Sequence, residues 1–386
     1  MKIKIAVKPE FPVLIGSTDY LNVSTVLEDK DGGRVFMLDM DSLFNSDDIN
    51  IKKLSDIFMN YYNSKNIKES FKKLQELYSK LPSKYLIQPE IEYEDELDIK
   101  KSDIKLPMGT FYSDNEKKIY KPYIPGSSLK GAVKNAVRNN FIKKHGLKLN
   151  SYNRKIEYSS NGKTSEKLDE IIFYSDFTDF NRVRHHQDIL NDVFRFIEFG
   201  DFYPEDDGFS IKIHKIERLK LGVRSSPIPS YGVAIDSGTF TGTIKVSNSL
   251  NMVYNYDKAK FNEISATFHK IFDLNIEDAS DTTKDIMINK MLKIVTDYYQ
   301  TILNEEKSYY NSIDVNNAKP ILIGFGGGIE EKTVIRSLGD PEFEKAKDII
   351  NGNNKKRKVN FQGRLPSTAW MINEKKFGVL FIEGQE

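Results

Sequence analysis

The chain has 386 residues and a formal net charge of +1, from 57 Lys and Arg against 56 Asp and Glu. This length allows one large or two ordinary domains, and we expect two. The absence of cysteine excludes disulfides and thiolate metal sites and is typical of a reducing cytoplasm. The N-terminus MKIKIAVKPEF alternates apolar and polar residues, and no segment is apolar enough to span a membrane. We therefore expect a cytoplasmic protein with no signal peptide and no membrane partner.

The positive charge is unevenly distributed along the chain. Residues 117–156 contain eleven Lys or Arg and no Asp or Glu, whereas 90–98 and 201–207 are acidic. A net charge near zero argues against a nucleic-acid partner, because nucleic-acid-binding domains are often strongly basic. The local concentration of cations matters more and indicates an anion-binding surface around 117–156. A second basic cluster, KKRK at 355–358, is interpreted as an exposed loop, with contact to phosphates as the alternative.

The first part of the chain is predicted to combine strands with helices packed on them. In order, we expect a strand at 2–9, a turn at Gly16, a strand at 34–39 and helices at 50–62 and 67–81. A loop-rich segment and then a cationic helix follow. This order is compatible with a ferredoxin-like half that carries an insertion.

From about residue 157 the sequence is rich in β-branched and aromatic residues bounded by Gly, Pro, Ser and Asp, which is typical of strands. We expect strands at 170–176, 194–202, 209–221, 238–247 and 367–383, a strand, glycine loop and helix at 319–339, and helices at 256–273, 284–309 and 342–350. The predicted fold class is α+β, with one domain at 1–156 and a second at 157–386.

The stretch YIPGSSLKGAVKNAVRNNFIKKHG at 123–146 predicts an amphipathic helix with an unusual start. Ser127 or Ser128 is the expected N-cap, yet the position three residues later is Lys130 or Gly131 instead of the Glu or Gln of a capping box. A lysine in the first turn costs roughly 0.3–1 kcal/mol and an interior glycine about 1 kcal/mol. Some further interaction should offset both costs.

A phosphate group would suit the start of this helix. Free backbone N–H groups, two serine hydroxyls, a glycine that allows close approach and a first-turn cation together favour an anion. Three cations spaced four residues apart form one stripe, which suits a polyanion better than a single phosphate. The alternative is a solvated helix face, which we favour for residues 143–145. The candidate contacts are Gly126, Ser127, Ser128, Lys130, Lys134 and Arg138.

A second candidate site is the glycine-rich stretch GFGGGIEEKT at 324–333. It is not a Walker loop, because two glutamates precede Lys332, and it is not a dinucleotide fingerprint, because Ile329 stands where Gly or Ala is needed. Such a turn either holds a sugar–phosphate chain with its amides or is a tight structural turn. The candidate contacts are Gly326, Gly327, Gly328, Lys332 and Arg336.

A third loop, PVLIGSTDYLN at 12–22, adds Gly16 and Ser17 as candidate contacts. Phosphate-friendly loops on an α+β scaffold point to a single-stranded or irregular nucleic acid held by its backbone. The RNP1 pattern of a standard RRM is missing, so base reading by sheet aromatics is not supported.

Several of these stretches resemble motifs of the CRISPR-associated RAMP superfamily. YIPGSSLKGAVKNAVRN is similar to the family's IPGSSLKGALR-type motif, and PVLIGSTDYLN resembles its first-strand loop, although Leu14-Ile15 replaces a frequent histidine. FRFIEFGDF at 194–202 and GTFTGTI at 238–244 resemble later strands of the family. GFGGGIEEKT resembles its C-terminal glycine-rich loop, and LPSTAW at 365–370 is similar to the Pro-x-Thr near its end. The order and spacing most resemble the family of fifth Csm subunits of type III-A effector complexes.

The resemblance implies tandem ferredoxin-like (RRM-like) RAMP domains with helical insertions that bind CRISPR RNA (crRNA). It implies a place at the 3′ end of the guide, beside a backbone Csm RAMP subunit, where the chain caps the filament. It also links the chain to 3′-end maturation, with host ribonucleases as the trimming partners. The candidate residues of all three loops would contact guide phosphates, and no cofactor or metal is expected.

A catalytic role is not expected. Asp19, Asp29 and Asp31 lie in or after the first loop and are interpreted as exposed turn residues. His185 and His186 are adjacent in sequence, so their side chains diverge and make a poor metal clamp. The alternatives are a RAMP endoribonuclease that processes guides or cuts targets, a Cmr-type RAMP subunit, and a protein scaffold whose cationic helix docks an acidic partner.

Overall fold

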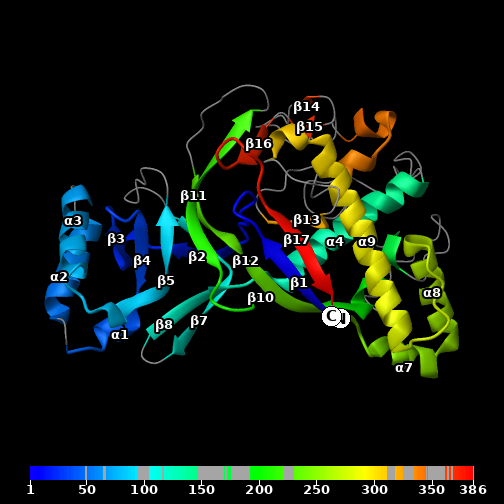
Figure 1. Ribbon diagram of the computed structural model, residues 1–386, viewed down its shortest axis with the longest axis horizontal. Coiled ribbons are helices and arrows are strands. Elements are labelled where there is room, and N and C mark those ends of the chain that lie inside the picture. The colour runs from blue at the N-terminus through cyan, green and yellow to red at the C-terminus, as the bar shows by residue number, and fades with distance from the viewer. Residues whose placement is uncertain are drawn as a thin grey trace.

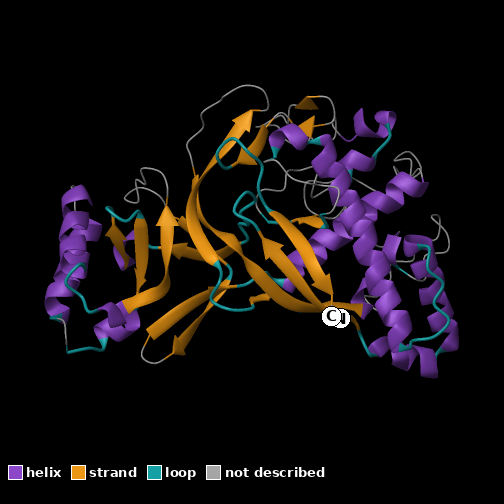
Figure 2. Cartoon of the chain, in the orientation of Figure 1, coloured by secondary structure: helices purple, strands orange, loops and turns teal. Residues whose placement is uncertain are grey.

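A large sheet forms the centre of the molecule, and helices gather at both of its ends (Figures 1 and 2). The computed structural model describes residues 1–47, 50–63, 67–93, 104–114, 117–145, 169, 172–174, 192–220, 230–310, 318–324, 334–344, 346, 361–362, 365–366 and 368–385. The fold is mixed α/β.

Fifteen strands belong to the large sheet, whose main path runs β13-β17-β1-β12-β11-β5-β4-β3. Two short strands, β14 and β15, pair separately. The strand bounds are β1 Lys2–Val7, β2 Gly16–Leu21, β3 Val26–Asp29, β4 Arg34–Leu38, β5 Leu86–Tyr93, β6 Ile104–Pro107, β7 Gly109–Asp114, β8 Lys117–Pro122, β9 Ile197–Phe199, β10 Tyr203–Pro204, β11 Ser210–Lys220, β12 Ser230–Val246, β13 Pro320–Leu322, β14 Phe361–Gln362, β15 Leu365–Pro366, β16 Thr368–Met371 and β17 Val379–Gln385.

Strand β12 connects the two parts of this sheet. Its first half pairs with β11 as far as Ser237, and its second half pairs with β1 from Gly238 onward. Gly238 has a φ of +138°, and a Cβ at this position would crowd Phe209. Only glycine adopts this conformation readily, so Gly238 lets one strand change partners within a continuous sheet.

The helices lie in two groups. The helix bounds are α1 Met40–Phe44, α2 Ile51–Asn63, α3 Ile67–Tyr78, α4 Gly126–His145, α7 Ser249–Tyr256, α8 Lys258–Phe272 and α9 Asp281–Glu305, with short 3₁₀ turns η5 at Val193–Phe196 and η7 at Ile335–Ser337. Helices α1 to α3 lie at one end of the sheet, whereas α4 and α7 to α9 lie at the other (Figure 1). Among the described helices, none is long and apolar enough to cross a membrane.

Two large hydrophobic clusters form the interior. The first gathers side chains of α2 and α3 against β3 to β6, with Ile213 and Val233 from β11 and β12. The second joins α4, α8 and α9 with β1, β12, β13 and β17. In it, Tyr299 of α9 is buried and donates its hydroxyl to the Ala132 carbonyl of α4 at 2.9 Å. The long helix α4 is thereby fixed against α9 along its buried face.

The second cluster contains residues from both sides of the predicted domain boundary. Leu129 and Val133 of α4 belong to the same cluster as Phe268 of α8. The two termini also meet, because Ile3 of β1 pairs with Gln385 of β17. The division at 156/157 stays a prediction, and the chain before residue 156 contributes to both clusters.

Most long elements agree with the sequence predictions. The strands at 2–9, 34–39, 209–221 and 238–247 and the helices at 50–62, 67–81, 256–273 and 284–309 are confirmed within a few residues. The strand at 170–176 is wrong where the structure describes it, because Ile172 and Phe173 are helical. The loop at 12–22 is wrong from Gly16 to Leu21, which form β2. The loop-rich segment before α4 contains four strands, β5 to β8.

Candidate functional site

The start of α4 is the point where segments far apart in the sequence meet. The Met108 amide donates to the Ile15 carbonyl at 3.1 Å, and the Tyr123 amide donates to the Met108 carbonyl at 2.9 Å. Gly324 has a φ of +83°, and a Cβ there would clash with the Leu14 carbonyl oxygen. The first loop, the turn into α4 and the beginning of the glycine-rich loop are therefore packed together.

Asp201 caps the N-terminus of α4. The Gly126 amide donates to Asp201 Oδ1 at 2.8 Å, and Ile124 and Phe202 exchange two backbone hydrogen bonds of 2.9 Å. The predicted N-cap is wrong, because the helix already begins at Gly126 and both predicted serines lie in its first turn. A carboxylate from a segment about 75 residues away in sequence takes the place of the expected serine side chain.

Gly126 is required by close packing, whereas Gly131 is not. A Cβ on Gly126 would clash with the carbonyl oxygens of Phe199 and Gly200. A Cβ on Gly131 would meet nothing within 4 Å, because this residue and Ser127 are exposed. No contact within the described chain explains a glycine in the middle of this helix, where it costs about 1 kcal/mol. The exposed side of Ser127 and Gly131 is thus open to another molecule.

Lys130, the first cation of the stripe, is bound by the protein itself. Its Nζ donates to the Phe194 carbonyl at 3.0 Å and to the Ile197 carbonyl at 3.1 Å. These carbonyls lie at the end of η5, where the Phe194 carbonyl also accepts the Ile197 amide, so the ammonium adds a further donor at the end of this turn. Burial, with the nearby charge of Lys134, lowers the pKa of Lys130. These hydrogen bonds offset the cost of a lysine in the first turn.

Lys134 and Arg138 are ion-paired within the chain. Lys134 Nζ lies 2.9 Å from Asp192 Oδ2 and 3.4 Å from Asp169 Oδ2. Arg138 Nη2 donates a hydrogen bond to Asp169 Oδ2 at 2.8 Å. The four side chains are 16–19% exposed, and the ring of Phe173 lies beside both cations. In the structure, the stripe binds Asp169 and the segment 192–197 to α4. Its predicted phosphate contacts stay a prediction.

The other predicted contacts are only partly within the described chain. Gly326, Gly327, Gly328 and Lys332 lie outside the described residues, as do His185 and His186 and the cluster at 355–358. The backbone of Ser17 belongs to β2, next to exposed Gly16. Arg336 lies away from the start of α4, between Glu305 and Glu306, and its side chain is 12% exposed. Burial lowers its pKa despite the Glu305 charge.

A group of tyrosines beside the start of α4 was missed by the sequence analysis. The rings of Tyr123 and Tyr203 are 5.5 Å apart, and Tyr112 and Tyr203 are 45% and 41% exposed. Partial burial and the neighbouring Asp201, Tyr112 and Tyr123 raise the pKa of Tyr203. Tyr112 lies on β7, Tyr123 directly follows β8 and Tyr203 begins β10. The aromatic residues of 111–123 were the available signal, but pairing with 203 is a long-range contact.

Two described residues of types that can act in acid–base catalysis, Asp29 and His214, are each paired with another side chain. Asp29 pairs with Arg34 at 3.2 Å, and His214 lies 2.9 Å from Asp236 on β11 and β12. Within the described part of the chain, no group of three or more His, Cys, Asp or Glu residues is placed to hold a metal ion.

Comparison with protein families decides the family. The model of the RAMP superfamily matches residues 12–278, which include the loop after β1, the IPGSSLKG turn and α4. This chain belongs to the RAMP superfamily. Within it, the sequence is 27% identical over 249 residues to a Methanocaldococcus jannaschii protein named CRISPR system Cms protein Csm5. That match covers 61% of this chain and 54% of the relative, so the chain matches about half the length of that protein.

Solved structures show the same fold. A chain of the Csm–crRNA–target RNA ternary complex of a type III-A CRISPR-Cas system superimposes with a TM-score of 0.66 at 18% identity, covering 99% of this chain and all of that one. The crystal structure of T. onnurineus Csm5 gives a TM-score of 0.59 at 16% identity, covering 98% and 100%. The mixed α/β fold is thus that of RAMP proteins of the Csm type.

Proposed function

We propose that this chain is the fifth subunit of a type III-A Csm complex, a non-catalytic subunit that binds the 3′ part of the crRNA. Membership of the RAMP superfamily, the similarity to a protein named Csm5 and the fold likeness to a chain of a Csm–crRNA complex support this proposal. In this role it caps the backbone filament beside a neighbouring Csm RAMP subunit. Host ribonucleases that trim the crRNA 3′ end are its proposed transient partners.

The meeting of three loops at the start of α4 carries the proposal. Gly16, the turn ending at Gly126 and the entry to the glycine-rich loop at Gly324 lie together, although they are more than 100 residues apart in sequence. The exposed hydroxyl of Ser127 at a helix start suits phosphate oxygens. Exposed Gly131 allows a sugar–phosphate chain to lie directly against the helix.

We assign the direct phosphate contacts to residues of these loops and of the helix start. They are Gly16, Ser17, Ser127, Ser128, Gly326, Gly327, Gly328 and Lys332. Gly126, which is buried and whose amide is bound by Asp201, contributes instead by shaping the turn. The stripe of Lys130, Lys134 and Arg138 would have to exchange carbonyl and carboxylate partners for phosphates. We therefore propose that the stripe acts mainly by holding the segment that carries Gly200 and Asp201 in place. Arg336, paired with two glutamates, acts in the same indirect way.

The exposed tyrosines provide a second kind of contact at the same place. Tyr112, Tyr123 and Tyr203 lie beside the helix start that would hold the phosphates. Aromatic side chains bind unpaired bases by stacking, which tolerates any sequence. A guide whose sequence changes from one spacer to the next needs binding of this kind. The tyrosines therefore fit a single-stranded guide better than a sequence-specific RNA.

The domain organisation is part of the same proposal. The antiparallel strands β13, β17, β1 and β12, with α4 and α9 against them, have the two layers expected of a ferredoxin-like unit. We propose a tandem of such units with helical insertions. Limited proteolysis with mass spectrometry distinguishes the boundary at 156/157 from a division along the two hydrophobic clusters.

Crosslinking along the guide tests the proposed function. A crRNA carrying 4-thiouridine at either its 3′ or its 5′ part is bound to the full-length protein, irradiated and mapped by mass spectrometry. We expect crosslinks from the 3′ part to peptides containing Tyr112, Tyr123 or Ser127. Crosslinks only from the 5′ part, or none at these peptides, would contradict the proposal. RNA shortened before irradiation would instead support the ribonuclease alternative.

A further inference from the structure

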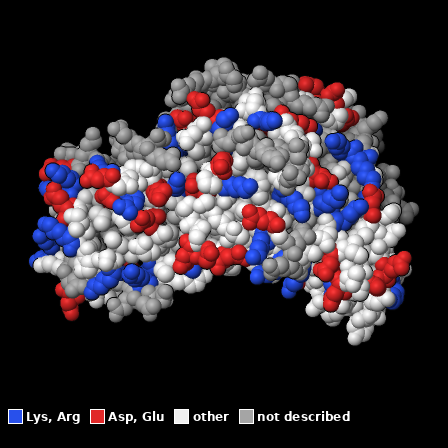
Figure 3. Space-filling view, in the orientation of Figure 1, with Lys and Arg blue, Asp and Glu red and all other residues white. Residues whose placement is uncertain are grey.

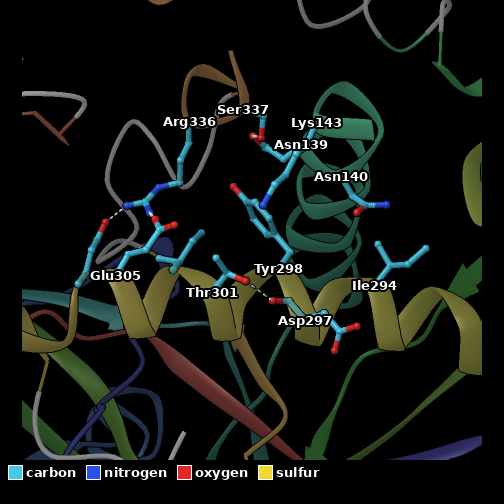
Figure 4. A pocket seen from close by; sticks show the side chains of 12 residues that line it. Asn139, Asn140, Lys143, Ile294, Asp297, Tyr298, Thr301, Glu305, Arg336 and Ser337 are labelled. Carbon is cyan, nitrogen blue, oxygen red and sulfur yellow. Dashed lines mark hydrogen bonds and ion pairs between the residues drawn. The ribbon is translucent and has the colours of Figure 1, made fainter. Parts of the chain in front are cut away.

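A polar cavity lies between α4 and α9, away from the start of α4. It measures about 620 Å³ and is lined by Asn140 and Lys143 of α4, Tyr298 and Thr301 of α9, and Arg336 of η7, among others (Figure 4). A smaller cavity of about 310 Å³ adjoins it and shares Asn140 and Lys143. Together they form one groove, here called the α4–α9 groove, of a size typical of small-ligand sites.

The groove is spatially separate from the start of α4. Asn140 follows Gly126 by 14 residues on α4, so it lies about 20 Å along the helix axis from the helix start. In Figure 3, Lys and Arg side chains gather over the region where Figure 1 places the C-terminal end of α4 and the middle of α9.

Tyr298 gives the larger cavity an aromatic wall. Its neighbour Tyr299 is buried against α4 and contacts the Tyr298 ring edge-on at 5.0 Å. Because consecutive residues on a helix point in different directions, Tyr298 faces the cavity while Tyr299 anchors the helix (Figure 4). Asn140, whose amide makes no hydrogen bond to the described part of the chain, lines both cavities. A ring held in place and an available amide are suited to a nucleobase.

The two ends of the groove carry different charges. Its smaller part is lined by three lysines, Lys143, Lys290 and Lys293, against the carboxylate of Asp297, which also lines the larger cavity. Lys143 and Lys293 form no ion pair with described residues. Lys144, also at this end, is already paired with Asp273. The opposite end holds Glu305 beside Arg336 (Figure 4). A phosphate is thus favoured at the lysine end and disfavoured at the glutamate end.

We propose that the α4–α9 groove binds one nucleotide of a single-stranded RNA, with its base against Tyr298 and its phosphate beside Lys143, Lys290 and Lys293. This gives the protein a second RNA-contacting surface at the far end of α4. The inference rests on the groove alone, so it can hold or fail independently of the proposed guide interface. A free nucleotide carries the same base and phosphate groups, so the test measures binding of RNA and of a free nucleotide separately.

Affinity measurements with matched variants test the groove. The full-length protein is titrated with a fluorescent 20-nucleotide single-stranded RNA and, separately, with uridine 3′-monophosphate. We expect Lys143→Ala/Lys293→Ala to weaken RNA binding about five- to tenfold and to reduce the salt slope by about 0.7, the value for one phosphate that is no longer neutralised. Exposed Lys52 and Lys53 of α2 provide the control, because Lys52→Ala/Lys53→Ala removes the same charge elsewhere and should change neither value by as much.

The aromatic wall is tested in the same titration. Tyr298→Ala should weaken RNA binding about fivefold or more, whereas Tyr298→Phe, which keeps the ring, should retain it. Photocrosslinking of a 4-thiouridine RNA gives a readout that does not depend on the stability of any variant. The expected adducts lie on peptides containing Tyr298 or Lys143.

Three results would overturn the proposal. The first is an unchanged RNA affinity in the lysine and tyrosine variants together with adducts confined to the start of α4. The second is groove-dependent binding of the free nucleotide without any effect of the variants on RNA. The third is binding of polyglutamate, but not RNA, that the lysine variant abolishes, which would assign the groove to an acidic protein partner.

Discussion

Asp201 Oδ1 accepts a hydrogen bond from the Gly126 amide at 2.8 Å, so a carboxylate lies where a guide phosphate is proposed to bind. The anion that the start of α4 favours is thus supplied by the chain itself. If RNA approaches this helix start, it meets the negative charge of Asp201 beside the exposed tyrosines.

Removing that charge should strengthen RNA binding. Asp201→Asn keeps an oxygen acceptor for the Gly126 amide but is neutral, so we expect affinity for single-stranded RNA to rise about two- to fivefold at low salt. Fluorescence anisotropy measures the change. Asp56→Asn, at an exposed position of α2, removes the same charge far from the site and serves as the control. Equal affinity of wild type and Asp201→Asn would place the RNA elsewhere.

Gly131 is expected to lower the stability of α4 and to favour RNA binding. Gly131→Ala should raise the free energy of unfolding by about 0.5–1 kcal/mol, because alanine is the better helix former and its Cβ meets open space. The same substitution, and more strongly Gly131→Gln, should weaken RNA binding by keeping the sugar–phosphate chain away from the helix. Chemical unfolding and RNA titration of the same samples give both values. A more stable variant with unchanged RNA affinity would show that nothing approaches this side of α4.

The long, strongly patterned elements were predictable from the sequence, and the long-range contacts were not. The helix at 126–145 and the strand at 238–246 follow from local periodicity. Ile172 and Phe173 were predicted as strand because they are β-branched and aromatic, but both are buried in a helical turn against Phe194. Packing in an aromatic core overrides such weak local preferences.

The candidate site was predictable only in its loops. The glycines and serines mark where the chain turns, and Gly126 and Gly324 do meet other backbone closely. Spacing along α4 could not show that Lys134 pairs with Asp192, because that ion pair joins residues 58 apart. The grouping of Tyr112 with Tyr203 could not be predicted from the sequence either, because it depends on β8 and β10 lying side by side.

The tyrosines beside the helix start should contribute stacking. Tyr112→Ala and Tyr203→Ala should each weaken RNA binding by about 1–3 kcal/mol if one base stacks on each ring. Replacement by phenylalanine should preserve binding, because the ring and not the hydroxyl is needed. Tyr256, 86% exposed on α7, supplies a control through Tyr256→Ala. Loss of affinity in the phenylalanine variants as well would point to hydrogen bonding instead of stacking.

Lys270 makes stability depend on pH. Burial lowers the pKa of this lysine from 10.5 to about 8, with the Phe141 ring 5.7 Å from its Nζ. Between these two pKa values the unfolded chain binds more protons than the folded protein, so this group makes stability rise with pH from about 8 to 10.5. Below pH 8 the folded protein bears the full free-energy cost of burying the charged Lys270 side chain.

Replacing Lys270 should therefore stabilise the protein at neutral pH. Lys270→Met is expected to raise the free energy of unfolding at pH 7 by up to about 3 kcal/mol, from about 1.4 kcal/mol for each pKa unit. The advantage over wild type should shrink toward pH 10.5. Urea unfolding of both proteins at pH 7 and pH 10 measures this difference. A difference that does not vary with pH would show that Lys270 titrates normally.

The central claim is that the start of α4 binds the phosphates of a single-stranded guide, and Ser127 tests it most directly. Ser127 is exposed in the first helical turn, where Glu is favoured by the helix dipole, so Ser127→Glu should fold at least as stably as wild type. Ser127→Gln is the neutral control of the same size. The measurement is the affinity of all three proteins for a crRNA 3′ fragment across a salt series.

We predict that Ser127→Glu weakens binding about tenfold at low salt, with a slope of log affinity against log salt shallower by about 0.7 for each phosphate that the helix start no longer holds. Ser127→Gln should stay close to wild type. Equal affinities and slopes for the three proteins would contradict the account, because a negative charge at the start of α4 would then leave the RNA undisturbed.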